Sequence, residues 1–262
     1  MLTEGLELLP LRGFPMVRPG DNISRLIIQC LGEQRLLLEP GDVLVVAQKV
    51  VSKAENRYVE LADIEPSLEA RELAAKVDKD PCLVEVILRE SNAVVRHAPG
   101  VLIVEHKLGL VMANAGIDSS NIEHDADSGA DRVLLLPEAP DRSADALRRT
   151  FVNFFGVNTG IIINDSVGRA WRNGTVGLAL GASGMPALWD RRGEQDLFGR
   201  TLEVTEVALA DELASAASLV QGEGAEGCPV VLIRGLKLST IDKQHYNDAA
   251  SLVRDRERDL FR

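Results

Sequence analysis

Short apolar runs that end in polar or turn-forming residues are the clearest structural signal in the chain. Val43 to Val46, Gly160 to Ile163 and Pro229 to Ile233 are three such runs, and Leu6 to Leu9 is a shorter one. Short runs that are rich in β-branched residues and bounded by turn residues favour a strand over a helix. We therefore expect these segments to form the buried strands of a sheet.

Four more segments have a strand pattern, and two of them are predicted to form a hairpin. The four are residues 101–104, 110–113, 132–136 and 175–181. The hairpin turn would lie at 106–109, which predicts a surface position for His106. Glycine is frequent in 175–181, so we expect a neighbouring backbone to approach that strand closely.

Apolar residues recur at helical spacing between the predicted strands. One helix is expected over 23–31, with Asp21 or Asn22 as its cap, and another over 80–90, where an Asp-Pro pair opens it. The other predicted helices span residues 66–77, 144–155, 207–220 and 248–260. This mixture predicts an α+β fold, with mixed sheets and flanking helices, in one domain over 1–262 or in two lobes.

Composition and charge limit the function classes without choosing one. The 262 residues are 45% hydrophobic and 26% charged, which is ordinary for a soluble globular protein with a sizeable core. The formal net charge is −11, and the sequence pI is about 4.9. A general nucleic-acid binder needs a basic surface, so this balance argues against a nucleic-acid partner. A nucleotide or phosphate site stays open, because it needs only local positive charge.

Cysteine use and the lack of a long apolar segment predict a cytoplasmic protein. Cys30, Cys82 and Cys228 are far apart and odd in number, which fits a reducing compartment and a role as small core residues. The first residues show no basic and apolar leader pattern. No apolar stretch approaches the roughly 20 residues of a membrane span, so no membrane partner is expected.

The segment 160–174 carries the densest group of candidate functional side chains. Its apolar run is predicted to end as a strand at Asn-Asp-Ser, and two arginines and a tryptophan follow. Asp165 and Ser166 offer hard oxygen ligands for a divalent cation, while Arg169 and Arg172 offer forked donors for a phosphate or carboxylate. The alternative is a polar loop in which the aspartate caps the next turn and pairs with an arginine.

Two other predicted strands are followed by polar groups. Lys49, Ser52 and Lys53 come after a buried strand, where they would meet an anionic ligand. The alternative for these lysines is solvation on an exposed strand. Asp118 and Asn121 follow a strand and a glycine turn. An ordinary Asx turn is the alternative for this second group.

The loop 221–227 follows a predicted helix and holds three glycines and two glutamates, among them Glu223. The alternative is a solvated turn after the helix. Together the three polar segments supply hard oxygen ligands, which suit Mg²⁺ or Mn²⁺ rather than Zn²⁺. A metal site beside lysines and arginines indicates nucleotide-dependent chemistry. The P-loop pattern and the G-x-G-x-x-G pattern are both missing, so the chain is not a P-loop NTPase.

Six long stretches, in order along nearly the whole chain, resemble the coenzyme F420-0:L-glutamate ligase family, also called F420 γ-glutamyl ligases. They are LPLRGFP at 9–15, GDVLVVAQKVVSKAE at 41–55, VMANAGIDSSN at 111–121, INDSVGRAWRNGTVGLALG at 163–181, QGEGAEG at 221–227 and PVVLIRG at 229–235. The DLFR ending also matches the family.

The resemblance implies a GTP-dependent ligase with a fold of its own, assembled as an intertwined homodimer. The enzyme would join L-glutamate through an amide to the lactyl carboxylate of F420-0, and then add a second glutamate by γ-linkage, releasing GDP and phosphate. Two divalent ions, Mg²⁺ or Mn²⁺, and a monovalent cation, K⁺, are the expected cofactors.

The resemblance also implies roles for individual residues. The metal ligands would be Asp118, Asp165, Ser166 and Glu223. The GTP contacts would be Leu11, Arg12, Gly13, Phe14, Gln48, Lys49, Ser52, Lys53, Asn121, Gln221, Gly222 and Gly224. The catalytic group would comprise Asp118 and Asp165 together with Arg169 and Arg172, which are candidates for the F420-0 phosphodiester.

A carboxylate is a poor electrophile, so phosphorylation by GTP would first make an acyl phosphate, and two metal ions would screen the charge between the reactants. A GTP-dependent amide ligase with another acceptor and a non-catalytic GTP and metal sensor are the alternatives. Few long amphipathic helices are available to cover a sheet, which supports a homodimer. The segment 182–198 is a candidate for reaching the partner, with a flexible surface loop as the alternative.

Overall fold

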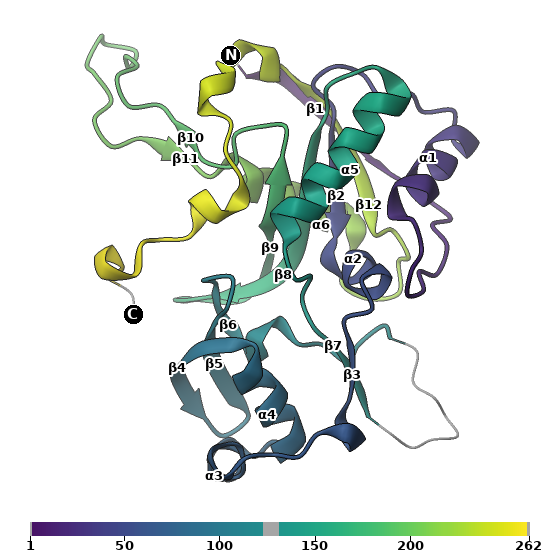
Figure 1. Ribbon diagram of the computed structural model, residues 1–262. Coiled ribbons are helices and arrows are strands. Elements are labelled where there is room, and N and C mark those ends of the chain that lie inside the picture. The colour runs from purple at the N-terminus through teal and green to yellow at the C-terminus, as the bar shows by residue number, and fades with distance from the viewer. Residues whose placement is uncertain (1, 123–130, 261–262) are drawn as a thin grey trace.

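A five-stranded sheet forms the centre of the computed structural model, which describes residues 2–122 and 131–260 (Figure 1). The strands are β1 (Thr3–Pro10), β12 (Val230–Leu236), β2 (Val43–Ala47), β8 (Gly160–Arg169) and β9 (Arg172–Ser183), in this spatial order. β2 and β8 run parallel, and the other neighbours are antiparallel. The parallel pair places the end of β2, at Ala47, beside Asn164 in the middle of β8.

Side chains that alternate along the central strands build a core on each face of the sheet. Leu44 and Ile161 pack on one face, with α1 (Ile23–Glu33) and α5 (Pro140–Phe155), whereas Ile162 packs on the other face, with α6 (Leu209–Gln221). α6 lies so close to β9 that a Cβ on Gly177 would collide with the backbone of the helix. The central strands read as nearly continuous apolar runs because both of their faces are covered.

Side chains cover the outer edge of β9. Asp211 accepts a hydrogen bond from the Ala179 N–H at 2.9 Å, and Ser215 Oγ donates to the Gly177 carbonyl at 2.7 Å. Asp141 accepts from the Ala182 N–H at 2.8 Å. These contacts satisfy backbone groups that an edge strand would otherwise offer to another chain.

A smaller lobe packs below the main sheet in the view of Figure 1. Its antiparallel strands are β4 (Ser91–Ala98), β5 (Val101–His106) and β6 (Val111–Ala113), and its helices are α3 (Leu68–Val77) and α4 (Pro81–Arg89). Leu73, Ile87 and Leu102 belong to its separate apolar core. The paired strands β3 (Tyr58–Glu60) and β7 (Arg132–Leu134) lie where the chain passes between the two lobes.

A two-stranded ribbon and several short turns complete the fold. The ribbon consists of β10 (Trp189–Asp190) and β11 (Glu206–Val207), and it projects from the main body in Figure 1. Helix α2 (Gln48–Ala54) follows β2 directly. The 3₁₀ turns are Leu61–Asp63, Asn114–Gly116, Leu238–Thr240, Lys243–His245, Ala249–Leu252 and Arg256–Arg258.

The main strands and two helix starts confirm the sequence predictions. Asn22 caps α1 by accepting from the Arg25 N–H, and Asp80 caps α4 by accepting from the Leu83 N–H. The α+β class with mixed sheets and flanking helices is also confirmed. In the described part of the chain, no helix is both long enough and apolar enough to cross a membrane.

Two predictions are wrong, and one strand was missed. β8 does not end at Asn-Asp-Ser but continues to Arg169, because β9 pairs with it along that length. The segment 248–260 is not a helix. It contains only 3₁₀ turns, and Asp141 holds its start by accepting from the N–H groups of Ala249 and Ala250. β4 was not predicted at all, since its Ser-Asn start and Arg-His end break the apolar alternation.

The predicted surface position of His106 is also wrong. Its side chain is buried, and Nδ1 accepts a hydrogen bond from the Leu108 N–H at 2.9 Å within the β5–β6 turn. Burial lowers the pKa of His106 to about 4, although the nearby Glu90 carboxylate opposes this shift. The turn therefore folds over its histidine, which is neutral at physiological pH.

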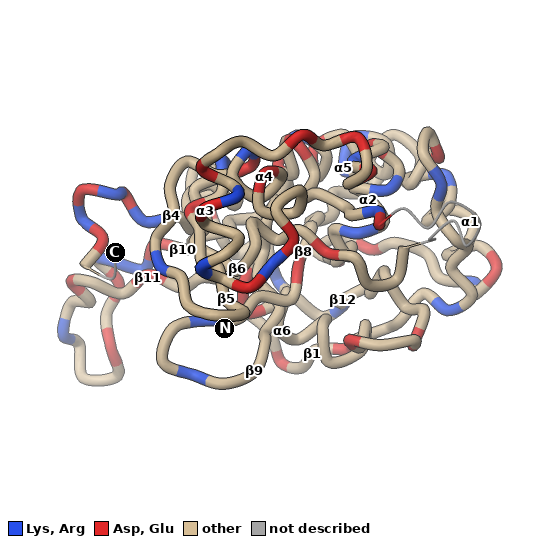
Figure 2. Tube along the Cα trace, turned by 90° about the horizontal axis from the view of Figure 1, so that it is seen from below, with Lys and Arg blue, Asp and Glu red and all other residues tan. Residues whose placement is uncertain are grey.

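Charged side chains are dispersed over the molecule. In the view of Figure 2, Lys and Arg positions are interspersed with Asp and Glu positions along the trace. Positive charge that serves a function must therefore be looked for at individual sites.

Candidate active site

A cavity of about 690 Å³, with both polar and apolar lining, lies where β2 ends beside Asn164 of β8. Four segments line most of it: the start of α2, residues 112–122, β8 from Asn164 to Gly168, and the loop after α6. Polar groups from all four segments reach this cavity.

Helix α2 presents two lysines to the cavity from successive turns. Lys49 and Lys53 are four residues apart, so they lie on the same side of the helix. Lys49 Nζ lies 2.6 Å from an Asp118 carboxylate oxygen and donates to Ser120 Oγ at 2.8 Å. Lys53 Nζ is buried and donates to the Asn121 carbonyl at 2.7 Å. The alternative of lysines solvated on an exposed strand is therefore wrong.

A turn with left-handed backbone conformation places Asp118 beside Lys49. Asn114, Ala115 and Gly116 have φ values of 51°, 54° and 67°. This conformation is costly for a residue with a Cβ atom, by about 1–2 kcal/mol. At Gly116 the close approach of Leu136, 2.9 Å from the position of a Cβ, leaves no room for a side chain. The turn directs the chain so that Asp118 pairs with Leu134 of β7 and faces α2.

Asp165 and Ser166 project from opposite faces of β8, because side chains alternate along a strand. β2 ends beside Asn164, so the following part of β8 has no neighbour on that side. Both faces consequently open to the cavity. Ser166 Oγ donates to a carboxylate oxygen of Glu223 at 2.6 Å. Asp165 faces the other group, which contains Lys49 and Asp118.

The two aspartates have opposite pKa shifts. Burial raises the pKa of Asp165 to about 6, and the Asp118 carboxylate adds to this, while the Ser166 N–H and Lys49 oppose it. Burial also acts on Asp118, but hydrogen bonds from Lys49 and Ser120 outweigh it and hold the pKa of Asp118 below its ordinary value. Asp118 is therefore held in its ionised form by its donors, whereas burial disfavours the ionised form of Asp165.

The loop after α6 forms another part of the cavity wall. Asn121 Nδ2 donates to the Gly224 carbonyl at 3.2 Å, which joins this loop to the Asp118 segment. Gly222 and Gly224 line the cavity with their backbones. The predicted residues Asn121, Gly222, Glu223 and Gly224 thus lie together at one wall.

Several predicted contacts lie elsewhere. Of the 11–14 loop, only Phe14 lines the cavity, while Leu11 is buried in the core of the main sheet. Gln48 does line the cavity. Ser52 is buried and donates to Gln48 Oε1 at 2.9 Å, so it orients Gln48 from behind.

Arg169 and Arg172 also lie outside the set of residues that line the cavity. They flank the tip of the β8–β9 hairpin, where Trp171 is 87% exposed and has a positive φ of 66°. Arg169 Nη1 donates to the Gly174 carbonyl at 3.1 Å, within the hairpin. The structure does not bring these arginines to Asp165 within one chain.

Comparison with known proteins agrees with the motifs gathered at the cavity. The family model of F420-0:gamma-glutamyl ligase matches residues 13–235. The chain belongs to this family. A coenzyme F420:L-glutamate ligase of Methanopyrus kandleri is 48% identical, over 98% of this chain and 99% of its own length. Those of Methanothermobacter thermautotrophicus and Methanocaldococcus jannaschii are each 44% identical, over 98% of this chain and 99% and 95% of their own lengths.

The matched region includes all of the polar groups that line the cavity of this F420-0:gamma-glutamyl ligase family member. Sequence reasoning missed the uncharged part of the lining. Met112, Ile117 and Val167 are apolar residues of the lining, and Thr175 and Cys228 also line the cavity. Neither group gives a distinct sequence signal, because apolar residues in strands and single polar residues in turns are common throughout the chain.

The oxygen donors of the cavity fit a hard divalent cation in their chemistry. Asp118 already pairs with an ammonium group, and burial, helped by the nearby Asp118 carboxylate, raises the pKa of Asp165. Among the described residues, no three His, Cys, Asp or Glu side chains are close enough to hold one metal ion. The predicted cation cluster of Asp118, Asp165 and Glu223 therefore stays a prediction.

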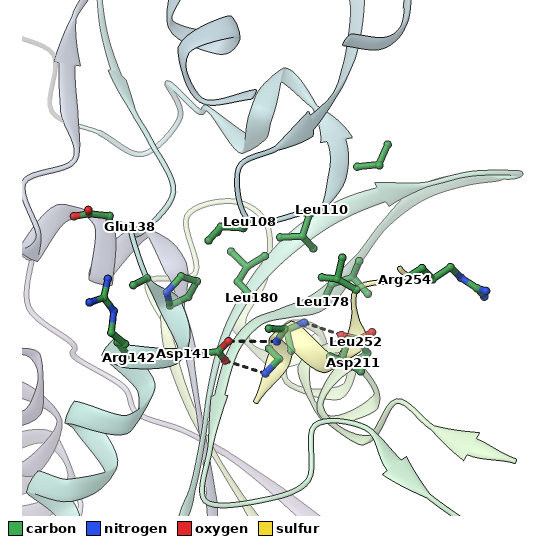
Figure 3. A pocket seen from close by; sticks show the side chains of 18 of the residues that line it. Leu108, Leu110, Glu138, Asp141, Arg142, Leu178, Leu180, Asp211, Leu252 and Arg254 are labelled. Atoms are coloured by element: carbon green, nitrogen blue, oxygen red, sulfur yellow. Dashed lines mark hydrogen bonds between the residues drawn. The ribbon is translucent and has the colours of Figure 1, made fainter. Parts of the chain in front are cut away.

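A second cavity, of about 410 Å³, lies between β9, α5 and the C-terminal segment (Figure 3). Leu108, Leu178 and Leu180 give it an apolar wall. Two of the carboxylates that line it, Asp141 and Asp211, accept the backbone hydrogen bonds that protect β9. These carboxylates therefore have structural roles, and the first cavity remains the candidate active site.

Proposed function

We propose that this protein is a GTP-dependent ligase that joins L-glutamate to the lactyl carboxylate of coenzyme F420-0 and then adds a second glutamate by γ-linkage. Membership of the family and the full-length similarity to coenzyme F420:L-glutamate ligases support this proposal. The observation that carries it is the cavity that gathers Lys49, Lys53, Asp118 and Asp165 from three separate segments.

The nucleotide phosphates would bind beside α2. The ammonium groups of Lys49 and Lys53 supply positive charge at the cavity wall, where low solvent exposure strengthens their attraction for phosphate. The Asn121 side chain and the backbone of Gly222 and Gly224 supply hydrogen-bonding groups on the facing wall. Binding of GTP would replace the present Lys49 to Asp118 pair, which frees Asp118 for another positive partner.

Divalent ions, Mg²⁺ or Mn²⁺, would be held by Asp118, Asp165, Ser166 and Glu223, with K⁺ as an additional cation. When bound, these ions would neutralise the negative charge that accumulates between phosphate and carboxylate. Ser166 would orient Glu223 through the hydrogen bond already present. The apolar wall around Met112 and Val167 would exclude water from the reacting groups.

The substrate carboxylate would first accept the γ-phosphoryl group of GTP. The resulting acyl phosphate is a reactive electrophile, and the amine of glutamate would then attack its carbonyl carbon. The new C–N bond would form as the C–O bond to phosphate breaks, and the amine would lose a proton. GDP and phosphate would be the other products.

The proposal extends to assembly as a homodimer. Leu197 and Phe198 at the β10–β11 ribbon are 99% and 91% exposed, and Trp171 is exposed at the hairpin tip. Apolar groups gathered on projecting segments are typical of protein interfaces. Because Arg169 and Arg172 lie outside the cavity of their own chain, a role in binding the F420-0 phosphodiester would require the cavity of a second copy.

Product analysis tests the proposed function. Incubation with GTP, Mg²⁺, F420-0 and L-glutamate should yield products that carry one and then two added glutamyl groups, detected by mass spectrometry. Replacing F420-0 by another carboxylate acceptor tests the alternative of a different amide ligase. Unchanged F420-0 in the complete mixture would overturn the proposal, and GTP binding without any product would favour the sensor alternative.

A further inference from the structure

Two buried amide side chains in the wall of the candidate active site form a reciprocal pair. Asn164 Nδ2 donates to Gln221 Oε1 at 2.8 Å, and Gln221 Nε2 donates back to Asn164 Oδ1 at 3.1 Å. Both residues are buried. Loss of either partner would leave polar atoms of the other unsatisfied, so the pair strongly favours a single arrangement.

Gln221 also reaches the opposite end of the loop that it begins. Its Nε2 donates to the Pro229 carbonyl at 3.2 Å, and the same carbonyl accepts from the Ala47 N–H at 2.8 Å. A primary amide has two N–H groups, and Gln221 uses both of them in these contacts. The pair therefore links the middle of β8 and the end of α6 to Pro229, the residue before β12, whose carbonyl also accepts from the end of β2.

Two groups that line the cavity are attached directly to the amide pair: Asp165 next to Asn164, and the loop 222–228 next to Gln221. Asp165 follows Asn164 directly, on the opposite face of β8. The loop 222–228 carries Glu223, which accepts from Ser166, and Gly224, which accepts from Asn121. A shift of the amide pair would consequently displace Asp165 and Glu223 relative to each other.

We propose that Asn164 and Gln221 are positioning residues, which hold the loop 222–228 against β8 in the arrangement that catalysis needs. This inference rests on the proposed ligase function. It assigns Gln221 a role different from the GTP contact expected from the family resemblance, because its N–H groups already have protein partners. Small misplacements of reacting groups are costly, at about 100-fold in rate for 1 Å.

Hydrogen exchange and kinetics of Gln221→Leu test the inference. Leucine keeps the bulk of the side chain but removes all three hydrogen bonds. Amide exchange in 222–228 should become about tenfold faster, and kcat should fall about tenfold or more. The KM for GTP should change less than kcat, because Lys49 and Lys53 still face the phosphates.

Ser215→Ala is the matched control, since it removes a different hydrogen bond between α6 and the sheet. It should lower the unfolding temperature while leaving both loop exchange and kcat near the wild-type values. The double variant N164Q/Q221N exchanges the two amide side chains and so moves one methylene across the contact. Compared with Gln221→Leu, it should bring loop exchange and kcat back toward the wild-type values. If that variant does not fold, Gln221→Glu replaces it, because it keeps an acceptor for Asn164 but loses both donors, and loop exchange should again increase.

The inference is overturned if Gln221→Leu leaves loop exchange at the wild-type rate, or if its kcat falls no further than that of Ser215→Ala. Inactivity of the wild-type protein would instead refute the proposed function. In that case the exchange measurement alone decides whether the pair positions the loop.

Discussion

Keeping the Asp165 carboxylate charged in its buried position costs free energy, which is unusual for a residue with only a structural role. Its carboxylate is held in a weakly solvated position beside Asp118, and its pKa is raised to about 6. A site that keeps such a group is typical of one that binds or transforms a charged ligand. Lys49, the Ser166 N–H and the Gln48 side chain only partly offset the effect of burial on this pKa.

Asp165→Asn should therefore reduce ligation at least 100-fold while leaving the protein folded, because asparagine keeps the shape of the side chain but removes its charge. The neutral side chain costs less to bury, so the unfolding temperature should stay equal or rise slightly. Steady-state ligation kinetics and thermal unfolding give the two readouts. Wild-type activity in this variant would rule out the role of Asp165.

Lys53 is the second residue whose removal is informative. Lys53→Ala should raise the KM for GTP or lower kcat by about tenfold or more, which is the usual effect of losing a hydrogen bond to a charged group. Lys76→Ala, at an exposed position of α3, is the control and should behave like wild type. Unchanged kinetics of Lys53→Ala would mean that Lys53 only anchors the Asn121 carbonyl.

Individual residues show how far sequence reasoning reaches. Asp118, Lys49 and Glu223 could be selected because charged residues after buried strands or between glycines are conspicuous. Asn164 could not, since its importance comes from a partner 57 positions away. Arg169 and Arg172 follow Asp165 closely in sequence, yet a hairpin carries them beyond the cavity that Asp165 lines.

At the scale of elements, local signals predicted the strands and helices whose ends are capped or covered. α1 and α4 have side-chain caps, and β2 and β12 are buried on both faces. The continuation of β8 past Asp165 could not be predicted, because pairing with β9 decides it. One extra residue in β9, Leu180, lies between the pairs Ile163 with Gly181 and Asn164 with Ala179. Such a bulge changes the direction of a strand.

The β5–β6 turn predicts a pH dependence of stability. Glu90, Lys107 and Arg57 are the charged groups around His106. The pKa of His106 falls to about 4 in the folded protein, from a value near 6.5 when unfolded. Between these values the unfolded chain binds the proton and the folded protein does not, so stability decreases as pH falls from about 6.5 to about 4. The full contribution is at most about 3 kcal/mol.

His106→Asn should lack this contribution, because asparagine does not titrate and its side-chain oxygen is able to accept from the Leu108 N–H. Urea unfolding of both proteins at several pH values between 4 and 7 measures the difference. The gap between wild type and variant should change in favour of the variant as pH falls. A gap that does not depend on pH would contradict a neutral, buried His106.

At the scale of the whole molecule, the exposed ribbon makes assembly the main prediction. Light scattering at micromolar concentration should give about twice the chain mass of 28.4 kDa. The double variant L197S/F198S should shift the mass toward that of one chain, because it removes two large exposed apolar side chains from the ribbon. A wild-type mass near 28.4 kDa would refute the homodimer.

Mixing of two inactive variants tests whether the assembled molecule shares its active site. Arg191 of the ribbon stacks on Trp189 at 4.9 Å and pairs with Glu194, so it also supports the ribbon itself. If the ribbon of one chain completes the site of the other, mixing an Asp165 variant with an Arg191 variant should restore activity. No recovery in confirmed mixed dimers would argue against a shared site.

The proposed function requires that the cavity between β2, β8 and α2 couples GTP cleavage to amide formation. Phosphate release, measured with each substrate omitted in turn, tests that claim most directly. Release should require F420-0 and L-glutamate together, with one phosphate for each amide bond formed. Phosphate release that does not depend on the two substrates, or amide formation without GTP cleavage, would contradict the account.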